Sequence, residues 1–174
     1  MALSLTKLAW LNSLTADEAA KELLQCCGSK RWAAEMVAAR PFETLETLLA
    51  KAHDVWWSLD RNDWLEAFRS HPKIGEKKAA DKVSAQSQQW SGQEQSGVSN
   101  ASQNTVDSLA ALNEDYEQKF GFIFIICATG KTSEEMLAAL KERLQNDSPT
   151  ELRLAAAEQA KITELRLKKL FTFA

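Results

Sequence analysis

The sequence predicts an all-α fold, a single multi-helix domain over residues 1–174. Three observations predict it. Ala, Leu, Glu, Lys and Gln, which favour helices, dominate the composition, whereas the chain has six Gly and three Pro. Apolar residues recur at helical spacing along most of the chain. A length of 174 residues is enough for one hydrophobic core but short for two domains.

Local start and stop signals predict four helices in the first half of the chain. Thr15 and Glu18 form a capping-box pattern, which opens a helix that runs through Leu24 and stops at Gly28. Further helices are expected from Ser29 to before Pro41, from Thr44 to Leu59 and from Asn62 to Ser70.

Two helices are predicted near the end of the chain. Ser133 is expected to cap a helix that runs to about Leu144, and the sequence NDSP at 146–149 breaks it. A long last helix is predicted from Thr150 to Phe171. Its buried side is expected at Leu154, Ala157, Ile162, Leu165 and Leu170.

Two stretches resist this assignment. The sequence FGFIFIICA at 120–128 is β-branched and aromatic, so propensity alone favours a strand. A single strand has no partner, so we expect a buried extended segment or a helix. The Ser-, Gln- and Gly-rich stretch 84–104 is typical of a flexible linker. It contains Trp90, however, and the alternative is a polar segment that folds over a site.

Charge and composition exclude some function classes. The net charge of −3 argues against a nucleic-acid-binding protein, which needs clustered Lys and Arg. The longest apolar run, Phe122 to Ala128, is too short to span a membrane. We see no signal peptide at the start and no peroxisomal tripeptide in the final FTFA, so a cytoplasmic location is expected. Cys26, Cys27 and Cys127 are an odd number of cysteines, which indicates reduced, inert thiols.

Common cofactor and metal motifs are missing. The sequence has no glycine-rich phosphate loop, no HExxH, no CxxC and no Gly-x-Ser-x-Gly. Its two histidines, His53 and His71, cannot build a histidine-rich metal site, although a mixed carboxylate site stays open. We therefore expect no metal and no cofactor, and acid–base chemistry if the protein is an enzyme.

His71 is the candidate acid–base group. An imidazole exchanges protons near neutral pH, which typically contributes about 100- to 10,000-fold in rate. Pro72 disfavours the helical conformation for the residue before it, so His71 must leave the helix extended, and Gly75 permits a sharp turn afterwards. A plain helix terminus is the alternative.

Further polar residues could complete a site. Ser91, Glu94 and Gln95 are close enough in sequence to orient an imidazole and bind a ligand rich in N–H and C=O groups. A solvated loop is the alternative. Arg166 could bind a carboxylate or ureido oxygen, or it could be a surface charge. We assign His53 no special role.

Five blocks of the sequence are informative when they are taken together. They are CCGSKRWAAEM (26–36), DWLEAFRSHPKIGE (63–76), WSGQEQSG (90–97), LNEDYEQKFGFIFIICATGK (112–131) and ELRL (164–167). In this order, and over almost the whole chain, they resemble the 2-oxo-4-hydroxy-4-carboxy-5-ureidoimidazoline (OHCU) decarboxylase family.

The resemblance implies an all-helical, cofactor-free and often dimeric enzyme that converts OHCU to (S)-allantoin and CO2 in urate breakdown. It implies His71 as the catalytic acid/base, with Glu94 beside it. Arg166 matches the late arginine of the family, with Arg143 as a rival. The other implied substrate contacts are Pro72, Ser91, Gln95 and the backbone of Phe124, Ile125, Ile126, Cys127 and Ala128.

Two other functions stay open at this point. A non-catalytic helical interaction module would expose apolar stripes and would need His71 only for stability. A related cofactor-free enzyme could act on another small ureido or keto acid, because the discriminating contacts are largely made by backbone.

Overall fold

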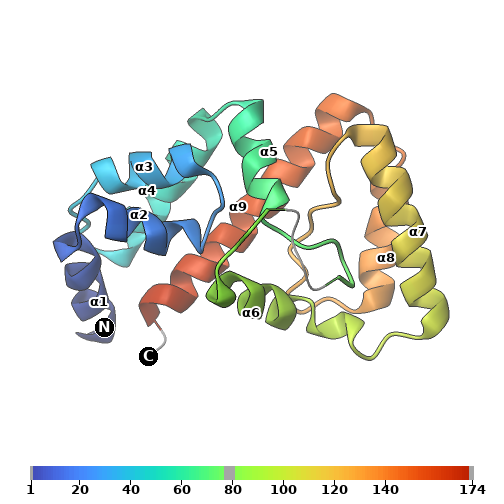
Figure 1. Ribbon diagram of the computed structural model, residues 1–174, viewed down its shortest axis with the longest axis horizontal. Coiled ribbons are helices and arrows are strands. Elements are labelled where there is room, and N and C mark those ends of the chain that lie inside the picture. The colour runs from blue at the N-terminus through green and yellow to red at the C-terminus, as the bar shows by residue number, and fades with distance from the viewer. Residues whose placement is uncertain (1, 77–80, 173–174) are drawn as a thin grey trace. The chain divides into compact units, whose positions relative to one another are not determined.

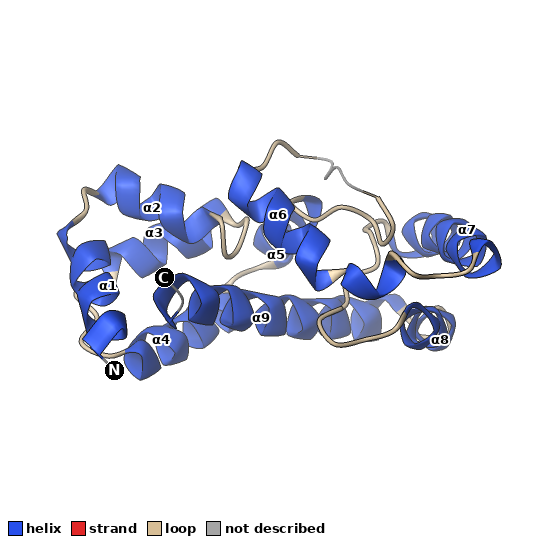
Figure 2. Cartoon of the chain, turned by 90° about the horizontal axis from the view of Figure 1, so that it is seen from below, coloured by secondary structure: helices blue, strands red, loops and turns tan. Residues whose placement is uncertain are grey.

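In the computed structural model, which describes residues 2–76 and 81–172, the chain forms two compact units. The first contains the residues up to Ala67 and those from Ala160 onward, and the second runs from Phe68 to Gln159. All regular elements in these ranges are helices, which confirms the predicted all-α class (Figure 2). The single domain predicted over 1–174 stays a prediction.

The first unit is built on four helices, with the start of a fifth and the end of the last. The helices are α1 (Ala2–Ser13), α2 (Ala16–Leu24), α3 (Lys30–Ala38), α4 (Leu45–Ser58) and α5 (Arg61–Arg69). Helix α3 packs against both α2 and α4 (Figure 1). The buried Trp32 indole donates a hydrogen bond to the Ala52 carbonyl at 3.1 Å, which ties α3 to α4.

Helix starts in the first unit follow the sequence closely. The predicted capping box of α2 is present: the Thr15 side chain accepts from the Glu18 N–H, and the Glu18 side chain accepts from the Thr15 N–H. Ser29 and Thr44 cap α3 and α4 in the same way, because their side-chain oxygens accept main-chain N–H groups that have no partner within the helix. Helix α1 was not predicted.

The second unit contains α6 (Ala85–Glu94), the short 3₁₀-helix η1 (Ser96–Val98), α7 (Gln103–Phe120), α8 (Ser133–Arg143) and the first part of α9 (Ser148–Thr172). Helices α7 and α8 lie side by side (Figures 1 and 2). The flexible-linker interpretation of 84–104 is wrong, because Ser84 caps α6 and one face of this helix is buried. The buried side chains are those of Ser87, Trp90, Ser91 and Glu94.

The aromatic stretch 120–128 forms neither a strand nor a helix. Helix α7 ends at Phe120, and Gly121 takes a left-handed conformation with φ of 80°, which favours glycine. The following residues, Phe122–Ala128, are non-helical, and all except Ile123 are buried. The strand that propensity favours does not form, since no other strand exists among residues 2–76 and 81–172 to pair with it.

Helix boundaries near the end of the chain differ from the predicted ones. Thr132, not Ser133, is the N-cap of α8, where it forms a capping box with Glu135. Helix α9 begins at Ser148 rather than Thr150, since the Asp147 carboxylate accepts from the Thr150 N–H at 2.8 Å. Pro149 therefore lies in the first turn, where a missing N–H costs little.

The predicted buried side of α9 is largely wrong. Leu154 is 40% exposed, and of the five predicted positions only Ile162 is buried. Four polar residues of α9 are buried instead, Glu151, Gln159, Thr163 and Arg166. The side chains of Glu151, Gln159 and Arg166 each find a hydrogen-bonding partner on another segment.

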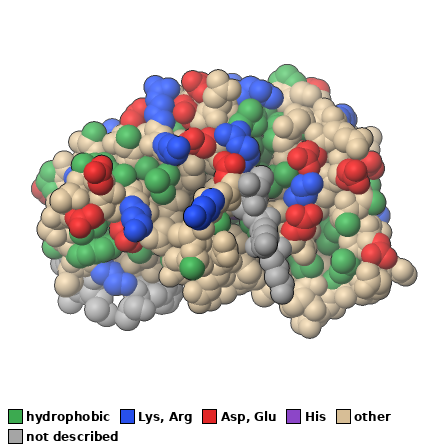
Figure 3. Space-filling view, viewed as in Figure 1, with side chains coloured by type: hydrophobic (Ala, Val, Ile, Leu, Met, Phe, Trp, Pro, Cys, Tyr) green, Lys and Arg blue, Asp and Glu red, His purple; other side chains and the backbone are tan. Residues whose placement is uncertain are grey.

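Surface charge follows the composition. On the face shown in Figure 3, acidic and basic side chains are interspersed. Within the described residues, no helix combines the length and the apolar character that crossing a membrane requires. The final Phe173 and Ala174, part of the FTFA sequence considered above, lie outside the described residues.

Candidate functional site

His71 lies in a turn directly after α5. The helix ends at Arg69, and the His71 N–H bonds the Phe68 carbonyl at 3.1 Å before Pro72 prevents further helix. Gly75 then adopts a positive φ of 90°, which completes the predicted sharp turn. The His71 side chain is buried, with 7% of the residue exposed. We call residues 71–76 the HP turn.

Within the second unit, the imidazole of His71 meets the side chain of Gln159. His71 Nε2 lies 2.7 Å from Gln159 Oε1, and Gln159, on α9, is fully buried. When the amide oxygen accepts this bond, the imidazole proton resides on Nε2, and Nδ1 is the basic nitrogen of the neutral ring. Sequence reasoning missed Gln159. The sequence signal that could have found it is the row of polar residues along α9, but the prediction of the buried face considered apolar residues alone.

The C-terminal end of α6 lies against the HP turn. Gln95, the C-cap of α6, accepts a hydrogen bond of 3.0 Å from the Gly75 N–H through its side-chain oxygen. Ser91 and Glu94 are both buried, with 5% and 8% of each residue exposed, and they share the buried face of α6. The structure therefore brings the predicted residues Ser91, Glu94 and Gln95 and the HP turn into one region of the second unit.

The segment 124–128 also belongs to this region. Burial raises the pKa of the Cys127 thiol, and the carboxylates of Glu158 and Glu94 raise it further. The Glu94 charge therefore acts on the same segment for which the family resemblance implies substrate contacts. Beyond α6, the backbone of η1 closely approaches Lys131, three residues after this segment, because a Cβ atom on Gly97 would lie 2.2 Å from the carbonyl oxygen of Lys131.

The two candidate arginines have different surroundings. Arg143, in the second unit, donates from Nε to Glu151 at 2.6 Å and from Nη1 to the Ile125 carbonyl at 2.5 Å. These protein contacts engage its guanidinium in holding the buried segment. Arg166 belongs to the first unit, where its Nη1 donates to the Gln25 carbonyl at 3.2 Å.

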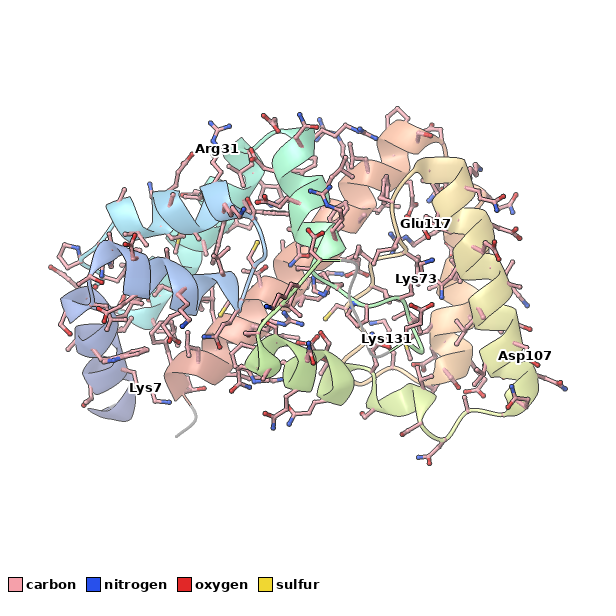
Figure 4. The ribbon with its side chains drawn as sticks, viewed as in Figure 1. Lys7, Arg31, Lys73, Asp107, Glu117 and Lys131 are labelled. Carbon is pink, nitrogen blue, oxygen red and sulfur yellow. The ribbon has the colours of Figure 1, made fainter. Side chains whose placement is uncertain are left out.

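A cavity of about 630 Å³ adjoins the HP turn, but neither His71 nor Glu94 lines it. Lys73, Ile74 and Gly75 form one wall, and α7 forms another. Lys73 and Glu117 point toward one another (Figure 4), with Nζ and Oε2 2.6 Å apart. This cavity therefore does not contain the predicted acid–base residues. The candidate site is the cluster of buried polar side chains, His71, Ser91 and Glu94.

This cluster suits proton transfer. It combines an imidazole, a carboxylate, a hydroxyl and an amide, each largely buried or bound to the turn, and such groups can orient a polar ligand while a proton moves. Among residues 2–76 and 81–172, no group of three or more His, Cys, Asp or Glu side chains could hold a metal ion.

Comparisons with known proteins identify the family. The family model of OHCU decarboxylase matches residues 12–168. The uric acid degradation bifunctional protein TTL of Arabidopsis thaliana is 43% identical over 84% of this chain and 45% of its own length. The 2-oxo-4-hydroxy-4-carboxy-5-ureidoimidazoline decarboxylase of Xenopus laevis is 32% identical over 76% of this chain and 75% of its own length.

A solved structure is similar as well. The crystal structure of OHCU decarboxylase in the presence of (S)-allantoin has a TM-score of 0.76 and 43% identity, and the match covers 87% of this chain and 98% of that chain. The present chain spans less than half the length of the bifunctional relatives that it matches. From the matched residues and the shared fold, the chain belongs to the OHCU decarboxylase family.

Proposed function

We propose that this protein decarboxylates OHCU to (S)-allantoin and CO2, with His71 as the general acid/base. The observation that supports this most directly is the buried, hydrogen-bonded imidazole of His71 in the same region as Glu94 and Gln95. Membership of the OHCU decarboxylase family supports the choice of substrate.

The chemistry asks little of the protein beyond proton transfer and orientation. In OHCU, the carbon that bears the carboxylate also bears a hydroxyl and adjoins a ring C=N bond. When the bond to CO2 breaks, its electron pair forms a C=C bond and the C=N electrons move to nitrogen, which takes a proton. Protonation of the ureido-bearing carbon and loss of the hydroxyl proton then give the ring carbonyl of allantoin.

Each predicted residue has a role in this proposal. His71 removes the hydroxyl proton or delivers the new C–H proton, and Glu94 balances the positive charge of the protonated imidazole. Orientation of the heterocycle and the ureido group is assigned to other groups. These groups are Pro72, Ser91, Gln95, Arg166 and the backbone of 124–128. Protonation on one face alone accounts for a single (S) product.

The test generates OHCU in situ from urate with urate oxidase and 5-hydroxyisourate hydrolase, adds this protein and follows circular dichroism. Spontaneous decay gives racemic allantoin without a signal, so a fast (S)-allantoin signal reports the enzyme. We expect His71→Asn to lose about 100-fold or more of this rate while staying folded. His53→Asn is the matched control, since the His53 side chain is 67% exposed.

Either of two results would contradict the proposal. A flat trace from folded wild-type protein would show that OHCU is not the substrate. The site would then act on another small ureido or keto acid, or would only bind a ligand. Near-normal turnover by His71→Asn would leave the proposed reaction in place but would show that His71 is not the acid/base. Glu94→Gln is expected to lose less activity than His71→Asn, because a group that balances charge is less essential than the proton carrier.

We further propose that the protein works as a homodimer in the cytoplasm, as the family resemblance implies. Light scattering coupled to size-exclusion chromatography measures the mass directly, and a mass near 19.4 kDa at micromolar concentration would contradict the dimer.

A further inference from the structure

The side chain of Gln159 contacts His71, the proposed acid/base. His71 Nε2 and Gln159 Oε1 lie 2.7 Å apart, although the two residues are 88 positions apart in sequence. Both residues are buried, Gln159 completely. We propose that Gln159 is a positioning residue that keeps the imidazole proton of His71 on Nε2 and so makes Nδ1 the nitrogen that exchanges protons. This inference rests on the proposed function of His71.

An amide is a suitable partner for a group that changes charge. Oε1 of Gln159 accepts from Nε2–H in the neutral ring, and it accepts from the same N–H of the imidazolium ion, where the charged donor strengthens the bond. The ring therefore gains and loses a proton on Nδ1 while its hydrogen bond to Gln159 stays in place. A carboxylate at this position would favour the charged ring by direct attraction, whereas a neutral amide adds no such charge.

Helix α9 holds Gln159 firmly enough for this role. Two turns earlier, the buried Glu151 binds the guanidinium of Arg143 at 2.6 Å, and it also accepts from the hydroxyl of Tyr116. These contacts fix the start of α9 to α7 and α8 within the second unit. A buried amide that loses its partner is costly, so the Gln159 side chain has a strong preference for the observed contact.

Other charges in this region also influence a titrating group. The carboxylates of Glu94 on α6 and Glu158 on α9 both act on the Cys127 thiol, and so does the ammonium group of Lys131. Their effects are present in every variant at position 159. A change in the tautomer or titration of His71 that appears only when residue 159 is substituted is therefore an effect of Gln159 and not of these charges.

The experiment compares Gln159→Met, which removes the hydrogen bond at similar volume, with Gln159→Glu, which keeps an acceptor and adds charge. Gln145→Met, at an exposed position, is the matched control. The chain contains two histidines, so ¹⁵N labelling of histidine yields two imidazoles, and the exposed His53 serves as an internal reference. The pH dependence of kcat/KM and of kcat is measured in parallel.

We expect wild-type His71 to show the Nε2–H tautomer at high pH and Gln159→Met to show a mixture of tautomers. In Gln159→Met, kcat is expected to fall about 10- to 100-fold with little change in KM. In Gln159→Glu, the His71 titration and the acidic limb of kcat/KM are expected to move together to higher pH by about one unit or more. His53 and the Gln145→Met variant stay unchanged.

Unchanged tautomer and titration in both position-159 variants, with kcat/KM within about twofold of wild type, would overturn the proposal. A general loss of structure is recognised because the His53 resonances and the far-ultraviolet circular dichroism then change as well, and Gln159→Glu provides the second comparison. The NMR measurement needs no turnover. If wild type fails to decarboxylate OHCU, the proposed function fails while the tautomer still decides whether Gln159 positions His71.

Discussion

The guanidinium of Arg143 donates a hydrogen bond of 2.5 Å to the main-chain carbonyl of Ile125. The same side chain pairs with Glu151, whose carboxylate is fully buried, and lies over the ring of Phe124. One arginine on α8 therefore holds a non-helical segment that has no strand partner in the described part of the chain. The backbone of that segment is the surface that we propose for substrate contacts.

Removal of Arg143 is expected to destabilise the protein strongly. Arg143→Met should lower the free energy of unfolding by about 3–5 kcal/mol, because Glu151 is left buried without its counter-charge. Urea denaturation measures the change. Adding Glu151→Gln should recover part of the loss. The control is Arg69→Met. The ion pair between Arg69 and Asp81 is half exposed and should contribute at most about 1 kcal/mol. Equal effects of Arg143→Met and Arg69→Met would contradict the prediction.

Gly97 is expected to tolerate no side chain. A Cβ atom there would lie 2.2 Å from the Lys131 carbonyl oxygen, so Gly97→Ala must push η1 away from that loop. We expect a loss of about 1–3 kcal/mol of stability and a lower decarboxylation rate. Gly92→Ala is the control within α6, since nothing lies within 4 Å of its Cβ position. That change should stabilise the helix by about 0.5–1 kcal/mol, and a loss of stability there would show that the reasoning is wrong.

The pairing of Lys73 with Glu117 should make stability depend on alkaline pH. The hydrogen bond that Lys73 donates to the Glu117 carboxylate raises the pKa of Lys73 above its usual 10.5. A lysine whose pKa is raised by folding stabilises the folded state below the unfolded-state pKa, and the contribution is lost as pH rises through the higher value. Glu117→Gln should therefore lower the unfolding free energy by at most about 1 kcal/mol at pH 7–9, with the difference closing above pH 10.5.

Unfolding free energies of wild type and Glu117→Gln, measured across this pH range, test the pairing. In a Lys73→Met background, Glu117→Gln should have no effect that depends on alkaline pH. A difference between wild type and Glu117→Gln that persists unchanged to the highest pH would assign the effect to packing rather than to the ion pair.

Cys27 is expected to be unreactive in the folded protein. Burial raises the pKa of its thiol to about 12, and the side chain is 1% exposed. At pH 8 only about one molecule in ten thousand carries the thiolate, which is the nucleophilic form. Iodoacetamide at pH 8, followed by peptide mass spectrometry, should leave Cys27 unmodified until denaturant is added. Rapid labelling of the native protein would contradict both the burial and the interpretation of this thiol as inert.

Local signals predicted much of the fold. The capping box at Thr15 and Glu18, the cap at Thr44 and the proline after His71 act within a few residues, so their effects can be predicted from the sequence. Helix α6 was harder. Its Ser- and Gln-rich composition resembles a linker, and only the burial of Trp90 and Glu94 against the rest of the second unit favours the helix. Helix propensity is a weak prior, and packing can override it.

The candidate site divides in the same way. Residue types and their order indicated His71, Ser91, Glu94 and Gln95, because acid–base and hydrogen-bonding groups are recognisable in sequence. Gln159 was missed, since a glutamine in a helix has no chemical signature until its partner is known. The buried face of α9 was misassigned for a related reason. Apolar residues such as Leu154 predict the buried face of a helix only if its polar residues are exposed, and several polar residues of α9 are buried.

The sequence by itself determined the all-α class, the starts of α2 to α5 and the end of α5 before His71, because these follow from propensities, caps and the ring of Pro72, which act over short distances. Only the tertiary structure decided that Gln159 binds the imidazole and that Arg143 binds the Ile125 carbonyl. These contacts join residues 88 and 18 positions apart. They form only when packed helices exclude water, so that each buried polar group must bind another.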